Sequence, residues 1–144
     1  MLPLMFPLRL VLDTNSVVSA VFKRGSLQRS TFTLAVTKPA RLYVTTQILD
    51  EYSEVLARPS LGLSKGTRLQ MLQLIKNRSY LVTPTRRIEV CSDPDDNIFL
   101  ECADAARADY LIIGNLKHFP AFWKSTKVIS AREFMDVIAP HLMG

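Results

Sequence analysis

Five short runs of apolar residues, rich in branched side chains, are separated along the chain by longer stretches of mixed polarity. They span residues 8–13, 41–45, 80–83, 110–114 and 127–130. A run that is apolar at nearly every position, rather than at alternate ones, is typical of a strand that is covered on both faces. The pattern therefore predicts five strands in the interior of the protein.

The stretches between these strands have apolar residues at helical spacing. The predicted helices begin near Ser26, Thr46, Ser64, Pro94 and Ser130. The second is expected to end near residue 57, because Arg58–Pro59 follows it, and the fourth near Ala108. The last one opens with a capping box between Ser130 and Glu133. Strands that alternate with helices predict a parallel sheet with helices on both faces.

We therefore expect the α/β class, as a three-layer α/β/α sandwich with a central parallel sheet of four to five strands. A chain of 144 residues suits one core of this kind, so residues 1–144 are predicted to form a single domain. An apolar share of 48% and a charged share of 22% are typical of globular proteins. No apolar run approaches the roughly 18 residues of a membrane span. The two cysteines suggest no disulfide framework, so we expect a cytoplasmic protein.

Polar residues follow several of these strands at the edge that parallel strands share. Asp13 ends the first strand, and Glu51 lies in the second turn of the helix that follows the second strand. Asp96 begins the fourth helix, and Asn115 comes directly after the fourth strand. Ligands of open parallel sheets bind beyond the carboxyl ends of the strands. We therefore expect these four oxygen-bearing side chains to meet.

Three carboxylates in one place repel one another unless a cation lies among them. Mg²⁺ and Mn²⁺ prefer oxygen ligands, so Asp13, Glu51 and Asp96 are predicted to bind one or two such ions. The chain has 18 Lys and Arg against 13 Asp and Glu, a formal charge of +5, which favours a polyanionic partner. An acidic metal site on a basic protein indicates phosphodiester cleavage, because the ion polarises the phosphoryl oxygen and activates water.

Each acidic residue also has a simpler explanation. Glu51, Asp95 and Asp96 lie in the first turns of predicted helices, where a negative charge stabilises the helix dipole. The segment DTN at 13–15 is typical of a turn that ends a strand. Asp13 is harder to explain in this way, because a carboxylate at the end of a buried strand is costly without a partner.

Four segments resemble the PIN domain when they are taken in their order and spacing. They are LVLDTNSVVSAVF at 10–22, TTQILDEYSEVLARP at 45–59, DPDDNIFLECADAARADYLIIGN at 93–115 and VISAREFM at 128–135. More narrowly, the chain is similar to the stand-alone PIN toxins of toxin–antitoxin pairs, the VapC-type ribonucleases. The resemblance covers residues from about 9 to 138. It implies a small α/β/α sandwich that cleaves RNA with Mg²⁺ or Mn²⁺, forms dimers or higher homo-oligomers and binds a cognate antitoxin protein.

By position, the resemblance implies that Asp13 is the first acid of the family, Glu51 the second and Asp96 the third, with Glu54 as a less favoured substitute for Glu51. The fourth acid of many members falls on Asn115, so the catalytic set is Asp13, Glu51, Asp96 and Asn115. The residues expected to support it are Thr14, Asn15, Asp93 and Asp95. Because an amide carries no charge, we expect one ion in the Asp13/Asp96 corner and a second that binds weakly or only with substrate.

Several residues outside the acidic set have two open interpretations. The predicted RNA-binding residues are Lys23, Arg24, Arg86, Arg87, Lys117 and His118, although solvated charges and a packing histidine are the commoner explanations. Trp123 suits either base stacking or packing. Leu69, Met71, Leu72 and Ile75 suit either the core or a face for a dimer partner or an antitoxin.

The prediction is a metal-dependent ribonuclease, most narrowly the toxin of a type II toxin–antitoxin pair. The alternative is a non-catalytic or weakly active RNA-binding or regulatory PIN module, in which the reduced acid set no longer holds metal well enough for turnover. A phosphatase that uses a nucleophilic aspartate is disfavoured, because Asn15 stands where such enzymes need a second acid.

Overall fold

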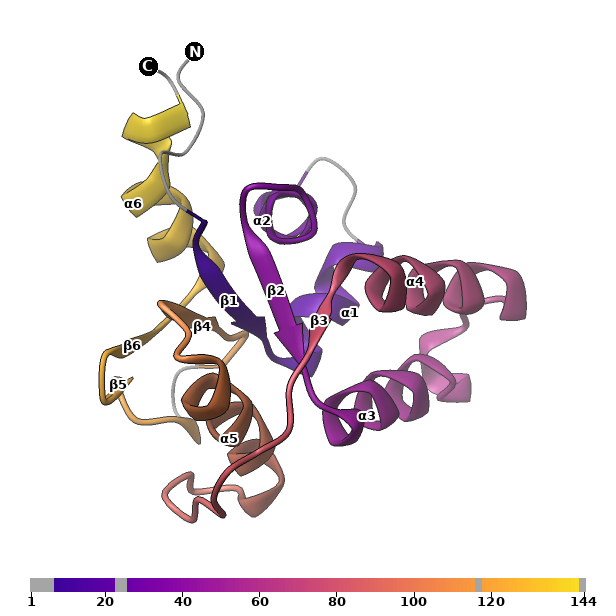
Figure 1. The fold of residues 1–144 in the computed structure, drawn as a ribbon. Helices are drawn as coiled ribbons and strands as arrows, with labels where there is room; N and C mark the ends of the chain where they lie inside the picture. Colours follow the sequence, from indigo (N-terminus) through magenta and orange to yellow (C-terminus); the bar gives the residue numbers. More distant parts are fainter. Residues whose placement is uncertain (1–6, 23–25, 116–117, 143–144) are drawn as a thin grey trace.

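The computed structural model describes residues 7–22, 26–115 and 118–142 of the chain. In these ranges six strands form one sheet with the order β3-β2-β1-β4-β6-β5 (Figure 1). The strands are β1 (Arg9–Leu12), β2 (Arg41–Val44), β3 (Tyr80–Leu81), β4 (Tyr110–Ile112), β5 (Phe122–Trp123) and β6 (Thr126–Ile129). Every neighbouring pair is parallel except β5 and β6. The five predicted strands are confirmed.

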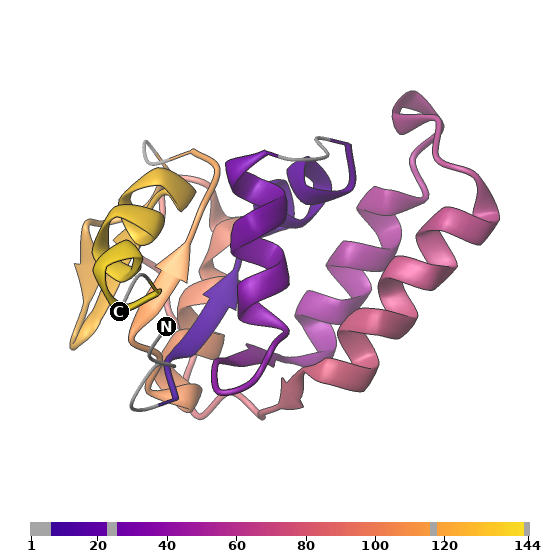
Figure 2. The ribbon, with the colours of Figure 1, turned by 90° about the horizontal axis from the view of Figure 1, so that it is seen from above.

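Helices cover both faces of this sheet. They are α1 (Thr14–Phe22), α2 (Leu27–Ala35), α3 (Thr46–Leu56), α4 (Lys65–Arg78), α5 (Asn97–Ala106) and α6 (Ala131–Leu142), with 3₁₀ turns η1 (Pro59–Leu61) and η2 (Pro94–Asp96). α5 lies on one face, whereas α1, α2 and α6 lie on the other, and α3 and α4 run side by side at the β3 end of the sheet (Figures 1 and 2). The expected three-layer α/β/α sandwich is confirmed. No helix in the described part of the chain has the length and apolar character needed to cross a membrane.

No helix was predicted from the sequence at Thr14–Phe22, where α1 follows β1 directly. The interpretation of residues 13–15 as a simple turn is wrong, because Thr14 already begins the helix. Three β-branched valines, at positions 17, 18 and 21, lower the helix propensity of this segment. The helix forms nevertheless, because Val17 and Ala20, one turn apart, are fully buried against the core. Tertiary packing thus outweighs local preference here.

Smaller differences concern the ends of elements. Thr45 rather than Thr46 caps α3, since its hydroxyl accepts the Ile48 N–H at 3.1 Å. The helix predicted from Pro94 to Ala108 is a 3₁₀ turn followed by α5, which ends where Arg107 adopts a left-handed conformation at φ 51°. Strand β5 is missing from the prediction because two residues are too few to show an alternating pattern.

The apolar residues of α4 divide between core and surface. Leu72 and Ile75 are buried, whereas Leu69 is 50% exposed. Of the two interpretations left open for these residues, the core applies to Leu72 and Ile75 and does not apply to Leu69. Trp123 is partly buried, and its indole N–H donates to Asp104, which favours packing over free base stacking.

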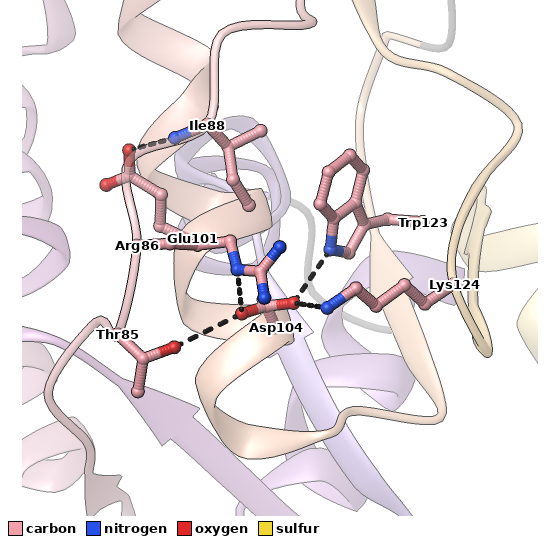
Figure 3. A network of polar contacts seen from close by, with 7 residues as sticks. All are labelled: Thr85, Arg86, Ile88, Glu101, Asp104, Trp123 and Lys124. Carbon is pink, nitrogen blue, oxygen red and sulfur yellow. Dashed lines mark hydrogen bonds and ion pairs between the residues drawn. The ribbon is translucent and has the colours of Figure 1, made fainter.

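A polar stripe on α5 holds the long irregular segment that leads into the acidic loop. Asn97, Glu101 and Asp104 are spaced by four and three residues, so they share one side of the helix. Asn97 accepts the N–H groups of residues 90 and 91, and Glu101 accepts the Ile88 N–H at 2.9 Å. Asp104 contacts Thr85, Arg86, Trp123 and Lys124 (Figure 3). The stripe therefore fixes the path of residues 85–91 along α5.

We predict that Asp104→Ala lowers the free energy of unfolding by about 2 kcal/mol, because the carboxylate is 6% exposed and accepts several donors. The Trp123 hydrogen bond, followed by Lys124, lowers the pKa of Asp104. A lowered pKa stabilises the fold above the unfolded-state value of about 3.9, and this contribution is lost as the pH falls through the folded-state pKa. Chemical denaturation should show that the free energies of unfolding of Asp104→Ala and of the unmodified protein differ by a constant amount near neutral pH. The difference should be smaller below about pH 4.

The matched control is Asp136→Ala, because Asp136 is exposed on α6. It should change stability by less than about 0.5 kcal/mol. Equal losses in the two variants would contradict a structural role for the Asp104 network.

Candidate active site

Asp13 lies at the carboxyl end of the central strand β1, beside β4. Its backbone N–H continues the sheet by donating to the Ile112 carbonyl at 3.0 Å, and the residue is only 4% exposed. One carboxylate oxygen accepts the Ser16 N–H at 2.8 Å, and the other accepts the Gly114 N–H at 3.0 Å. Burial raises the pKa of Asp13 above its usual range, although these hydrogen bonds oppose the shift. The carboxylate is thus held in one orientation, between α1 and the end of β4.

Position 114 requires a glycine for a steric reason. A Cβ atom at this position would lie 2.7 Å from the Cβ of Asn15, which is closer than van der Waals contact allows. The absence of a side chain lets the end of β4 approach the first turn of α1, and this approach brings the Gly114 N–H to Asp13. Gly114 was not among the residues predicted for the site; a glycine directly after a buried strand was the available signal.

Glu51 reaches the same region from α3. Its carboxylate accepts the Thr14 hydroxyl at 2.9 Å. The next residue, Tyr52, is fully buried and donates its hydroxyl to the Leu12 carbonyl, one residue before Asp13. This contact fixes the second turn of α3 against the end of β1. Glu54 is 73% exposed and pairs with Arg58, so Glu51 is the acid of α3 that faces Asp13.

Asp96 is supplied by the η2 turn, and Asp93 shapes that turn. The Asp93 side chain accepts the Asp95 N–H at 3.0 Å, while its carbonyl accepts the Asp96 N–H at 3.0 Å. His118 Nδ1 lies 3.4 Å from a carboxylate oxygen of Asp96. Burial, and then the charge of Asp93, raise the pKa of Asp96, whereas His118 opposes the shift.

The three predicted acids line one small hollow, of about 120 Å³, which we call the acidic hollow. Its lining residues are Asp13, Thr14, Asn15, Glu51, Val55, Arg58, Asp96 and Phe99. These residues come from three segments, 13–15, 51–58 and 96–99, of which the first two follow strands β1 and β2 as expected. Asn115 is exposed and lies one residue beyond Gly114, but it is not one of the lining residues.

The donor set of the acidic hollow suits a hard divalent cation. Burial raises the pKa of both Asp13 and Asp96, and the charge of Asp93 adds to the shift of Asp96. A divalent ion would relieve this cost, and carboxylate oxygens are the ligands that Mg²⁺ and Mn²⁺ prefer. Asp96 also belongs to a second group, with Asp93 and His118, whose ligand atoms lie within 4.8 Å of one another. Asp96 is thus common to both groups.

The predicted basic residues do not line the acidic hollow where they are described. Arg86 pairs with Asp104, and Arg87 pairs with Glu89 at 3.2 Å. Both arginines line a separate cavity of about 710 Å³ between α5 and the segment that precedes it. His118 is the predicted basic residue that contacts the acidic set. Lys23, Arg24 and Lys117 lie outside the described residues.

We predict that Gly114→Ala lowers the free energy of unfolding by about 1–3 kcal/mol, since the new methyl group forces Asn15 away. The same shift moves an N–H donor away from Asp13, so the variant should also bind Mn²⁺ more weakly in titration calorimetry. Gly66→Ala is the control, because a Cβ at this position on α4 meets only the Ser64 hydroxyl, at 4.0 Å. It should raise stability by about 0.5–1 kcal/mol. A tolerated alanine at 114 would contradict the close packing described here.

Comparison with known proteins supports the family resemblance seen in the sequence. A family model described as PIN domain matches residues 9–117. An uncharacterized protein of Methanocaldococcus jannaschii is 25% identical over 104 residues, which are 70% of this chain and 67% of that protein. The resemblance inferred from the four sequence segments is confirmed.

Two solved structures are similar in fold. One is VapBC2 from Rickettsia felis, bound to a DNA fragment from their promoter, with a TM-score of 0.55 and 17% identity over 76% of this chain and 90% of that one. The other is the RRP44 PIN domain of T. brucei, with a TM-score of 0.51 and 8% identity over 96% of this chain and 84% of that one. At these identities the likeness concerns the fold alone.

Proposed function

The chain belongs to the PIN domain family, whose fold is a nuclease fold, and from this premise we propose that the acidic hollow cleaves RNA phosphodiester bonds with Mg²⁺ or Mn²⁺. The observation that carries the proposal is the meeting of Asp13, Glu51 and Asp96, from three separate elements, in one hollow. The excess of basic residues over the whole chain supports a polyanionic substrate.

The three acids share one role in this proposal, and neighbouring groups orient two of them. Asp13, Glu51 and Asp96 would hold the ion, which supplies polarisation of a phosphoryl oxygen and activation of water when bound. The N–H groups of residues 16 and 114 orient Asp13, and the hydroxyl of Thr14 orients Glu51. These contacts place the carboxylates before the substrate arrives, which lowers the reorganisation needed during the reaction.

We further propose that the protein is the toxin of a type II toxin–antitoxin pair, with a cognate antitoxin protein and a second copy of the chain as partners. The fold likeness to VapBC2 supports this proposal. Induced expression of the chain should arrest the growth of a host that lacks the antitoxin. The variants that remove metal ligands should not arrest it.

The alternative function is a non-catalytic or weakly active RNA-binding or regulatory module. The observation that favours it is Asn115, which provides an amide where many family members carry a fourth acid. A protein of this kind would bind RNA without metal-dependent cleavage.

Cleavage of a fluorescent RNA distinguishes the two functions. We expect Mn²⁺-dependent cleavage by the unmodified protein, and at least a hundredfold lower rate for Asp13→Asn and for Asp96→Asn, because each loses a charged ligand. Asp136→Asn, on the exposed side of α6, is the matched control and should cleave normally. If cleavage survives both substitutions in the acidic hollow, the activity comes from another site or a contaminant.

The neutral residue at 115 predicts a particular metal stoichiometry. Titration calorimetry of the unmodified protein should show one Mn²⁺ site, and Asn115→Asp should tighten Mn²⁺ binding by about three- to tenfold through its added charge. The same charge should lower the melting temperature of the metal-free variant by about 1–3 °C. Asn77→Asp, on the exposed side of α4, should change neither quantity. Two tight sites on the unmodified protein would contradict this prediction.

A further inference from the structure

Arg58 lines the acidic hollow together with the three carboxylates, although in the sequence it marks only the end of a predicted helix. Glu51 and Val55 lie one turn apart on α3, so they share one side of the helix, and Arg58 follows two residues after the helix ends. Among the described residues that line this hollow, Arg58 alone carries a positive charge.

The backbone of Arg58 is fixed at the junction between α3 and η1. Its N–H donates to the Val55 carbonyl at 3.1 Å, and its own carbonyl accepts the Leu61 N–H at 3.0 Å. The residue is extended, at φ −63° and ψ 129°, as the proline that follows requires. The side chain of Arg58 therefore starts from a fixed backbone at the edge of the hollow.

The guanidinium itself is only weakly engaged. Its ion pair with Glu54 spans 3.8 Å, and the two side chains are 55% and 73% exposed, so the pair costs little to break. Arg29 and Arg78 differ from it, because each donates to main-chain carbonyls of neighbouring helices. Arg58 is thus an arginine beside the acidic set whose charge is not used to hold the fold together.

We propose that Arg58 binds the non-bridging oxygens of the RNA phosphate that enters the acidic hollow. The inference rests on the proposed function. A phosphodiester that approaches three carboxylates is repelled by them, and an arginine at the rim offsets this repulsion. A guanidinium can donate two parallel hydrogen bonds to one phosphate, which fixes its orientation as well as attracting it. Arg58 would leave Glu54 for the phosphate when RNA binds.

The test compares Arg58→Ala and Arg58→Lys with Arg132→Ala, which removes the same charge from an exposed position on α6. Arg58→Ala should lower kcat/KM for Mn²⁺-dependent cleavage of a labelled single-stranded RNA by at least about tenfold. Arg58→Lys should lie between Arg58→Ala and the unmodified protein, because it keeps the charge and loses the paired donors. Arg132→Ala should match the unmodified protein. Melting temperatures of all three variants should stay within about 2 °C of it, since both arginines are exposed.

Chemical rescue separates phosphate binding from a structural role. Added guanidinium ion should restore part of the activity of Arg58→Ala relative to the same concentration of NaCl, and should not raise that of Arg132→Ala. Normal kcat/KM in Arg58→Ala would overturn the inference while leaving the proposed nuclease function in place. Loss of activity without rescue, together with a lowered melting temperature, would also overturn it.

A binding measurement keeps the inference testable if the proposed function fails. Fluorescence anisotropy of the same RNA, with Ca²⁺ in place of Mn²⁺, gives the slope of log K against log salt concentration. Arg58→Ala should reduce the magnitude of this slope by the amount that about one phosphate contact contributes, whereas Arg58→Lys should leave the slope unchanged. An unmodified protein that binds RNA without cleaving it would overturn the nuclease function alone. An unchanged slope in Arg58→Ala would overturn the phosphate contact alone.

Discussion

The carboxylate of Asp13, buried at the end of the central strand, is the group on which the arrangement of the site depends. It accepts N–H groups from Ser16 at the start of α1 and from Gly114 at the end of β4. Burial makes the ionised form of Asp13 costly and thereby raises its pKa, and these two donors offset part of that cost. Gly114 can donate only because it has no side chain against Asn15. One charged group thus ties the sheet to the helix that follows it.

The two other acids are brought to Asp13 by contacts that are not themselves acidic. The Tyr52 hydroxyl fixes α3 to the Leu12 carbonyl, so Glu51 faces Asp13. The polar stripe of α5 fixes the segment that leads into the η2 turn, which carries Asp96. Both groups of contacts hold their acid from outside the hollow. Stability and function are therefore coupled here, since a carboxylate cluster without a cation is held together against its own repulsion.

The success of the sequence prediction varies with how local each feature is. The five parallel strands, the helix caps near Ser26, Ser64 and Ser130, and the three acids follow from patterns within a few residues. The prediction fails for α1, whose valines disfavour a helix in isolation, and for β5, which exists only because it pairs with β6. The choice of Glu51 over Glu54 also depends on contacts with β1 and with Arg58.

The sequence by itself determined the α/β order of elements and which side chains end the strands. This is because strands buried on both faces and helices with apolar spacing can each be recognised within a single segment. Only the tertiary structure decided that Gly114 must be a glycine, since the Asn15 side chain that leaves no room for a Cβ comes from the other end of the chain. It alone also placed a weakly paired Arg58 among three carboxylates and turned Arg86 and Arg87 to a different cavity. The physical reason is that charge and steric contact act through space, and distances between remote segments are set by the packing of helices on the sheet.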